Sequence, residues 1–161
     1  MTEPAPEVTV RPARTEDADL LLAWANDPVT RAASFSSAVI DRPDHLRWLA
    51  ERLASPRTRL YVGELDGVPV GQVRFDLGPD GTAGGGISVA PAMRGRGLGR
   101  ALLRAGVTAI WADPAFAGVT LVARVRVDNA RSLRLFEGVG FRHRSTGTCD
   151  GAPCVTLELA P

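Results

Sequence analysis

Residues 89–100 read VAPAMRGRGLGR, and this stretch decides the fold. Its three glycines allow the backbone to turn freely and to approach a ligand closely. Residues 83–89, which end at the start of this stretch, have the pattern of a strand. The apolar residues that follow recur with helical spacing and predict a helix through Trp111. Unpaired N–H groups and the positive dipole end at the start of that helix favour a pyrophosphate ligand, although a glycine-rich turn without a ligand is the alternative. The spacing matches neither the dinucleotide fingerprint nor the Walker loop, because Gly-Lys-Ser/Thr is absent and no acidic residue follows about 20 positions later.

Strands are predicted on both sides of this loop by alternating or β-branched residues. Before the loop they occupy 8–12, 59–65, 68–77 and 83–89, with Asp66-Gly67 and residues 79–81 as turns. After the helix that ends at Trp111, the expected elements are a strand at 118–127, a helix at 129–141 that ends at a glycine, a further strand, and a hairpin around Asp150-Gly151.

Two helices are expected between the first two strands. Thr15 is the expected cap of the first helix, with Glu16 and Asp17 in its first turn, and this helix ends near 26–28. Pro43 opens the second helix, whose buried face consists of Leu46, Leu49, Ala50 and Leu53. The order of elements predicts one mixed α/β domain with a central sheet over residues 8–159, after a short tail at 1–7.

The composition of the 161 residues excludes several classes of protein. The formal net charge is +1, which gives no general attraction to nucleic acid or to an anionic membrane. No apolar run approaches the roughly 20 residues that span a bilayer, and the N-terminus is unlike a secretory signal, so a cytoplasmic protein is expected. Cys149 and Cys154 are therefore expected to be reduced, and their spacing gives no zinc site and no other metal site. All 19 basic residues are arginine.

Two motifs resemble those of the GNAT superfamily of N-acetyltransferases. The first is V-x-P-x-x-R-G-x-G-L-G-x-x-L at 89–102, and the second is V-x-x-D-N-x-x-S-x-x-L-F-E-x-x-G-F at 125–141. Their order and separation also fit that superfamily. The resemblance implies the GNAT fold, in which a central, mostly antiparallel twisted sheet of six to seven strands is flanked by about four helices.

The resemblance also implies acetyl-CoA as the cofactor and assigns residues to it. The backbone of the glycine loop holds the pyrophosphate, the end of the fourth strand exposes backbone groups to the pantetheine, and the Val89 N–H points at the thioester oxygen. Asn129 bonds the pantetheine arm or caps a helix, or does both. The expected cofactor residues are Ile87, Ser88, Val89, Arg94, Gly95, Arg96, Gly97, Leu98, Gly99, Arg100, Asn129, Ser132 and Phe136.

The side chains that usually transfer protons in this superfamily are missing. The positions that match the two known glutamate bases are Gly86 and Arg124, and the position of the usual tyrosine acid is Phe136. Either the enzyme works by positioning, with water removing the proton, or the base lies elsewhere. His45 is the first candidate by its ordinary pKa, and Asp76, Glu64 and Tyr61 are weaker ones. The glycines at 84–86 make room for an acceptor or form a flexible strand start.

Residues 24–48 and the segment GQVRFD at 71–76 resemble the subgroup that acetylates nucleotide-linked amino sugars, as in pseudaminic acid biosynthesis. In that interpretation aromatic rings stack on sugar or base, and two arginines hold a diphosphate. The alternative places both tryptophans in the core. The expected acceptor residues are Trp24, Asn26, Arg31, Ser34, Phe35, His45, Trp48 and Arg74.

The function that follows is transfer of an acetyl group to a primary amine of a small molecule, by direct attack in a ternary complex. Other acceptors are an amino acid, an antibiotic amine or a protein N-terminus, and the other class is a non-catalytic acyl-CoA binding module. Neither nucleic acid nor membrane is an expected partner. A homodimer through the hairpin at 145–159 is a candidate assembly.

Overall fold

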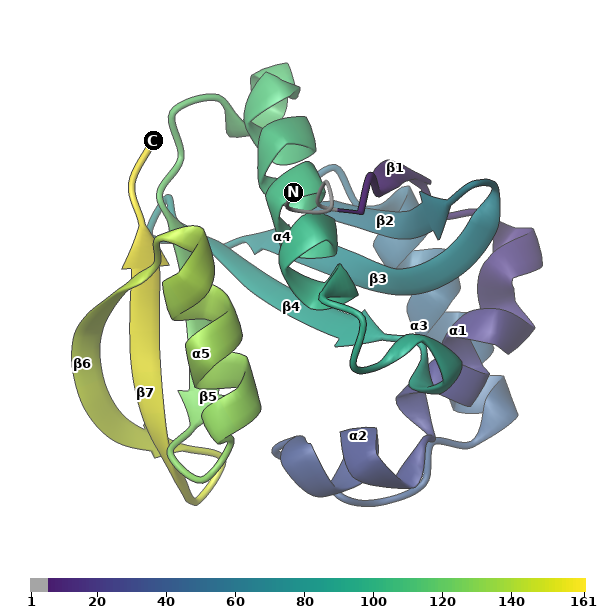
Figure 1. Ribbon diagram of the computed structural model, residues 1–161, viewed down its shortest axis with the longest axis horizontal. Helices are drawn as coiled ribbons and strands as arrows, with labels where there is room; N and C mark the ends of the chain where they lie inside the picture. Colours follow the sequence, from purple (N-terminus) through teal and green to yellow (C-terminus); the bar gives the residue numbers. More distant parts are fainter. Residues whose placement is uncertain (1–5) are drawn as a thin grey trace, which may run out of the picture.

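The computed structural model describes residues 6–161, which form a seven-stranded sheet in the order β1-β2-β3-β4-β5-β7-β6 (Figure 1). The strands are β1 (Thr9–Pro12), β2 (Thr58–Leu65), β3 (Val68–Leu77), β4 (Ala83–Val89), β5 (Leu121–Arg126), β6 (Arg142–Cys149) and β7 (Ala152–Leu159). Every pair of neighbours is antiparallel except β4 and β5, which are parallel. The expected mixed α/β architecture, with a central, mostly antiparallel sheet of six to seven strands, is confirmed.

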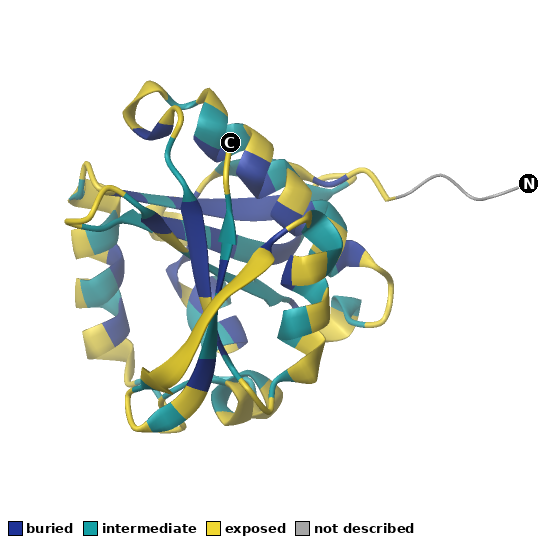
Figure 2. Cartoon of the chain, turned by 90° about the vertical axis from the view of Figure 1, so that its left-hand side faces the viewer, coloured by how far each residue is buried: buried dark blue, intermediate teal, exposed yellow. Residues whose placement is uncertain are grey.

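Helices cover both faces of the sheet. Within residues 6–161 they are α1 (Ala18–Ala25), α2 (Pro28–Ala33), α3 (Arg42–Ala54), α4 (Leu98–Ala112) and α5 (Ala130–Val139), with short 3-10 turns at Thr15–Asp17, Pro91–Met93 and Pro114–Phe116. The larger core joins the sheet to α4 and α5 through Phe75, Leu102 and Phe136. A smaller core joins β2 to α1 and α3 through Leu21, Leu49 and Val62. Figure 2 shows that β6, at the sheet edge, is exposed along almost its whole length.

The predicted turns and helix ends are confirmed where glycine or aspartate signals were used. The Asp66-Gly67 turn joins β2 to β3, and both residues have positive φ, 51° and 79°. Asp150-Gly151 does the same between β6 and β7, with φ of 47° and 80°. Helix α5 ends at Gly140 in the left-handed conformation. These are the backbone states that favour Asp, Asn and Gly, so local sequence determines them.

Two helix predictions are corrected. Thr15 does not cap the first helix, because it begins the 3-10 turn Thr15–Asp17 and Asp17 occupies the N-cap position of α1. Arg14 precedes the turn, and its N–H donates to the Asp17 carboxylate at 2.7 Å. Helix α3 buries His45 and Leu49, with Trp48 half-buried beside them, whereas Ala50 is exposed and Leu53 is 38 % exposed. Burial against α1 and β2 selects a face that includes histidine and tryptophan, and the apolar pattern alone did not reveal it.

The expectation of reduced cysteines is wrong, because Cys149 and Cys154 form a disulfide. In the β6–β7 ladder Cys149 pairs with Ala152 and Cys154 pairs with Gly147, so the two cysteines lie diagonally across the hairpin. Their Cα atoms are 5.8 Å apart, which lies within the range that a disulfide bridges. The register of β6 against β7 brings the two cysteines together, and composition and spacing do not reveal it.

The tail expected at 1–7 lies mostly outside the described residues, and Pro6 and Glu7 belong to no helix or strand. In the described part of the chain, no helix has the length and apolar character needed to cross a membrane.

The Asp17 carboxylate links β1 to the first helical turn, and we expect its replacement to destabilise the protein. Arg11 donates two hydrogen bonds to it, both 2.8 Å, and these bonds are the main reason why the pKa of Asp17 is lowered. Because the pKa of Asp17 is lower in the folded protein than in the unfolded chain, where it is about 4, the ionised carboxylate stabilises the fold at any pH above about 4. This stabilisation is lost as the pH falls through the pKa of the folded state. Asp17→Asn is therefore expected to lose about 1.5 kcal/mol of unfolding free energy at pH 7.

Urea unfolding at pH 7, 5 and 3.5 measures this effect, and the difference between variant and wild type should shrink at the lowest pH. Asp19→Asn is the matched control, since Asp19 is 79 % exposed in its ion pair with Arg42 and should change the free energy of unfolding little. An unchanged difference at pH 3.5 would contradict the assignment.

Candidate functional site

The sheet opens between β4 and β5 (Figure 1). Only two residue pairs, Ala83 with Leu121 and Gly84 with Val122, join these strands, and beyond them the strands diverge. The Ala83 N–H donates to Thr120 on the β5 side, and the Ala90 N–H donates to Val70 on the β3 side. Backbone groups alternate along a strand, so the N–H and C=O groups of Ile87 and Val89 point into the gap. The chain thus presents unpaired backbone donors and acceptors at this opening.

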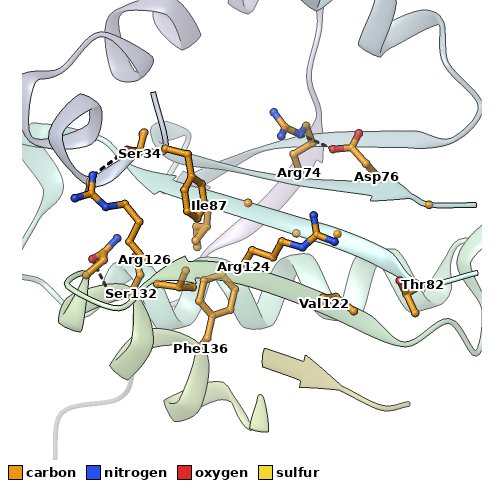
Figure 3. Close-up of a pocket in the computed structure, with 18 of the residues that line it drawn as sticks. Ser34, Arg74, Asp76, Thr82, Ile87, Val122, Arg124, Arg126, Ser132 and Phe136 are labelled. Carbon is orange, nitrogen blue, oxygen red and sulfur yellow. Dashed lines mark hydrogen bonds and ion pairs between the residues drawn. The ribbon is translucent and has the colours of Figure 1, made fainter. Parts of the chain in front are cut away.

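Three cavities meet at the opening, and Ser34 and Ile87 line all of them. We call the first the loop cavity, about 580 Å³, which lies between the glycine loop, α2 and α5. The helix cavity, about 500 Å³, lies against α1 and α3. The glycine cavity, about 720 Å³, contains Gly84–Gly86 and β5 residues and is drawn in Figure 3. Together they form one cleft that passes through the gap in the sheet.

The loop cavity is built to hold anions. Gly97 caps α4 in the left-handed conformation without a side-chain hydrogen bond, which leaves the first N–H groups of the helix available to a ligand. Four arginines line the cavity, and none of its lining residues within 6–161 is acidic: the arginines are Arg94, Arg100, Arg131 and Arg134. The last two lie three positions apart on α5, and sequence reasoning missed them although this spacing places them on one helix face.

Most of the expected cofactor residues lie in the loop cavity. They are Ile87, Ser88, Val89, Arg94, Gly95, Gly97, Leu98, Gly99, Arg100, Asn129 and Ser132. The Asn129 side chain accepts from the Ser132 N–H at 3.2 Å, so it caps α5. Arg96 is not among the lining residues; it is exposed, and its nearest side-chain partner is the sulfur of Met93. Phe136 lines the glycine cavity and packs edge-on against Phe141.

Arg94 also ties the loop to α2. Its guanidinium donates to the Asp27 carboxylate at 2.7 Å and to the Thr30 hydroxyl at 3.1 Å. Asp27 caps α2, and the hydrogen bond from Arg94 is the main reason for the lowered pKa of Asp27. Arg94 thus holds the helix that forms one wall of the loop cavity, which the sequence motif did not indicate.

Three of the expected acceptor residues have structural roles instead, and these predictions are corrected. Trp24 is 6 % exposed in the smaller core and lines none of the three cavities. Asn26 bonds both the N–H and the carbonyl of Ile40, at 2.7 and 2.8 Å, and so closes the loop after α2. Arg31 lines the helix cavity, but it donates to backbone carbonyls of Ala25, Ser36 and Ala38 and is not free to grip a diphosphate.

The other expected acceptor residues lie in the cleft. Ser34, His45, Trp48 and Arg74 line the helix cavity, and Phe35 lines the glycine cavity. The Arg74 guanidinium lies 5.3 Å from the centre of the Trp48 ring and donates to Asp76 at 2.8 Å. These residues supply aromatic surface together with an arginine whose charge is already neutralised.

Of the proposed proton acceptors, only His45 and Asp76 line the cleft, and both make hydrogen bonds within the chain. His45 is buried with Nε2 3.0 Å from the Ala18 carbonyl oxygen, so this nitrogen carries the hydrogen and Nδ1 keeps its lone pair. One Asp76 oxygen accepts from Thr58 at 2.7 Å and the other from Arg74. Glu64 pairs with Arg11 on the far strands, and burial raises the pKa of Tyr61. No described heavy atom lies within 4 Å of the point where a Cβ on Gly86 would stand.

Comparison with known proteins agrees with this arrangement. Residues 7–142 match the family model described as acetyltransferase (GNAT) domain. The fold resembles that of aminoglycoside acetyltransferase AAC(6')-Ib with coenzyme A and kanamycin, at 25 % identity, 96 % and 95 % coverage of the two chains and a TM-score of 0.82. It also resembles spermidine N-acetyltransferase from Vibrio cholerae with coenzyme A and spermine, at 15 % identity, 96 % and 95 % coverage and a TM-score of 0.83. A third match is yncA from Salmonella typhimurium with acetyl-CoA, at 25 % identity, 96 % and 94 % coverage and a TM-score of 0.75. No curated protein sequence matches significantly.

Proposed function

Because the chain belongs to the acetyltransferase (GNAT) family, we propose that its loop cavity binds acetyl-CoA and that the helix and glycine cavities receive the amine acceptor. The observation that carries this proposal is the cleft itself, in which an arginine-lined anion site leads through the opened sheet to two further cavities. The α4 N-terminus and three of the arginines, Arg100, Arg131 and Arg134, suit the phosphates, whereas Arg94 is paired with Asp27. The free backbone groups of Ile87 and Val89 suit the pantetheine amides.

Acetyl-CoA supplies the activated acyl group, and this chain supplies position and polarisation. The Val89 N–H points into the gap, where it donates to the thioester oxygen as negative charge develops there. The C–N bond forms as the C–S bond breaks, the amine loses one proton, and the sulfur leaves as thiolate. Thiols have an ordinary pKa near 8.5, so this leaving group needs little help from an acid.

The proposed acceptor is a small amine. A nucleotide-linked sugar is no longer favoured, because the two residues expected to bind its diphosphate are not available. Arg31 and Arg74 were the residues expected to hold a diphosphate, and both are occupied by other groups. The similar structures are of enzymes named for aminoglycosides and for spermidine, which fits a small-molecule amine and supports the alternative of an antibiotic amine over a nucleotide-linked sugar.

We expect a single rising limb in the pH dependence of kcat/KM. Both Asp76 oxygens accept hydrogen bonds, and buried His45 keeps a lone pair only on Nδ1. We propose that water rather than this nitrogen takes the proton, so the limb should follow the pKa of each free amine. Two amines of different pKa, followed by thiol release across pH, test this. His45→Gln should leave the position of the limb unchanged. A limb at one fixed pH for both amines, lost in His45→Gln, would identify His45 as the base.

Thiol release from acetyl-CoA with a panel of amines tests the function as a whole. The panel contains an aminoglycoside, spermidine, amino acids, free amino sugars and a nucleotide-linked amino sugar. Turnover with any member supports the enzyme. Tight binding of coenzyme A by calorimetry without turnover on any amine would instead support a non-catalytic acyl-CoA binding module.

A further inference from the structure

We infer that Arg124 binds a carboxylate of the acceptor, so that the preferred acceptor is an amino acid; this rests on the proposed function. Three arginines line the glycine cavity. Arg74 pairs with Asp76 at 2.8 Å, and Arg126 pairs with Asp128 at 2.7 Å. Among residues 6–161, the exposed Arg124 side chain makes no hydrogen bond or ion pair with another residue, so it is the one arginine of this cavity whose charge the chain does not balance.

The other carboxylate of the cavity does not serve Arg124. Asp80 accepts hydrogen bonds from the N–H and the hydroxyl of Thr82, at 3.0 and 2.8 Å, within its own turn. These bonds are the first causes of the lowered pKa of Asp80, which therefore stays ionised and locally satisfied. A ligand carboxylate is the natural counterion for Arg124, because guanidinium and carboxylate form two parallel hydrogen bonds.

The position of Arg124 is where an acceptor must arrive. The last β4–β5 pair is Gly84 with Val122, and two residues further along each strand stand Gly86 and Arg124. In Figure 3 the Arg124 side chain extends from β5 into the gap toward β4. Because Gly86 has no side chain and the space beside it is open, nothing from β4 covers the guanidinium. The Val89 N–H opens into the same gap between β4 and β5, and Ile87, two residues before it, lines both the loop cavity and the glycine cavity. A carboxylate bound to Arg124 therefore lies on the acceptor side of that gap.

An unbalanced guanidinium also selects against other amines. Like charges repel in a partly enclosed cleft, so a polyamine or an aminoglycoside with several ammonium groups is disfavoured beside Arg124. Phe35 and Ile87 line the same cavity and give apolar surface to the acceptor's side chain. The chemistry of the cavity therefore suits an amine that carries one carboxylate and an apolar group.

Phenylalanine and phenylalaninamide form the matched pair that tests this inference, since they differ only in the carboxylate. We expect kcat/KM, corrected for the fraction of neutral amine, to be at least tenfold higher for phenylalanine. Arg124→Gln should abolish this ratio, Arg124→Lys should retain part of it, and Arg124→Glu should favour the amide. Arg144→Gln is the control variant, because Arg144 is an exposed arginine on β6 that lines none of the cavities.

Equal rates for the acid and the amide in the wild type, a preference for spermidine or kanamycin, or a ratio unchanged in Arg124→Gln would each overturn the inference. Circular dichroism checks that each variant is folded. If Arg124→Glu does not fold, Arg124→Gln and Arg124→Lys still test the inference. Turnover of amines without preference for the carboxylate defeats this inference alone. Absence of turnover on every amine defeats the proposed function and this inference with it.

Discussion

Replacing Val89 by proline is expected to lower kcat about 100- to 1,000-fold, the loss typical of removing one donor to a developing oxyanion. Proline removes the backbone N–H that points into the gap between β4 and β5. The pairing of Gly71 with Val89 places that N–H on the side away from β3, so no hydrogen bond of the β3–β4 ladder is lost. Ser88 already lies in a strand, which is the conformation that a following proline requires.

Val89→Ala is the control for this change, since it shortens the side chain and keeps the N–H. Steady-state kinetics with acetyl-CoA varied up to saturation separate the two variants. In Val89→Pro, KM for acetyl-CoA should change far less than kcat. A proline variant that is folded and retains kcat within a fewfold of Val89→Ala would show that this N–H does not assist the reaction.

Gly71→Ala is expected to destabilise the protein by about 3 kcal/mol, at the upper end of the range for overpacking. A Cβ at Gly71 would overlap the carbonyl oxygen of Ser88 and lie 3.1 Å from the Cα of Val89. Both contacts are with backbone, so no side chain can rotate to relieve them. The relief must come from β4 moving at the residues that face the cofactor, and a displacement of about 1 Å there lowers kcat/KM about 100-fold.

Gly86→Ala is the matched control on the facing strand, because open space surrounds its Cβ position. Its free energy of unfolding should stay within about 0.5 kcal/mol of the wild type. Urea unfolding and kinetics of both variants complete the comparison. Equal stability of the two alanine variants would mean that β3 and β4 separate at Gly71 without cost.

Local signals explain what could be predicted from the sequence. The glycine loop, the turns at Asp66-Gly67 and Asp150-Gly151 and the helix end at Gly140 each depend on a backbone conformation that few residues adopt. The disulfide depends instead on the register of β6 against β7, which no local pattern fixes. Sequence reasoning therefore predicted the strands of this hairpin and missed the bond between them.

The acceptor side of the cleft was harder to predict for a different reason. Trp24 and Trp48 both lie on amphipathic helices, yet one is in the core and the other lines the helix cavity. How each helix packs against β2 decides which tryptophan lines a cavity, and this packing is a tertiary property that the helix sequence alone does not give. Arg31 carries the right charge for an anion, and only its bonds to local carbonyls show that it is occupied.

Helix α2 is one wall shared by the loop cavity and the helix cavity. Thr30 lines both the loop cavity and the helix cavity, and Ser34, just beyond the helix, lines all three. Arg94 fixes this helix to the glycine loop through Asp27. When coenzyme A shifts or steadies this wall, the acceptor's affinity changes too, and thermodynamic reciprocity makes the acceptor alter coenzyme A affinity by the same factor. The two substrates of this protein are thus expected to bind cooperatively, and a substitution in α2 should change both dissociation constants together.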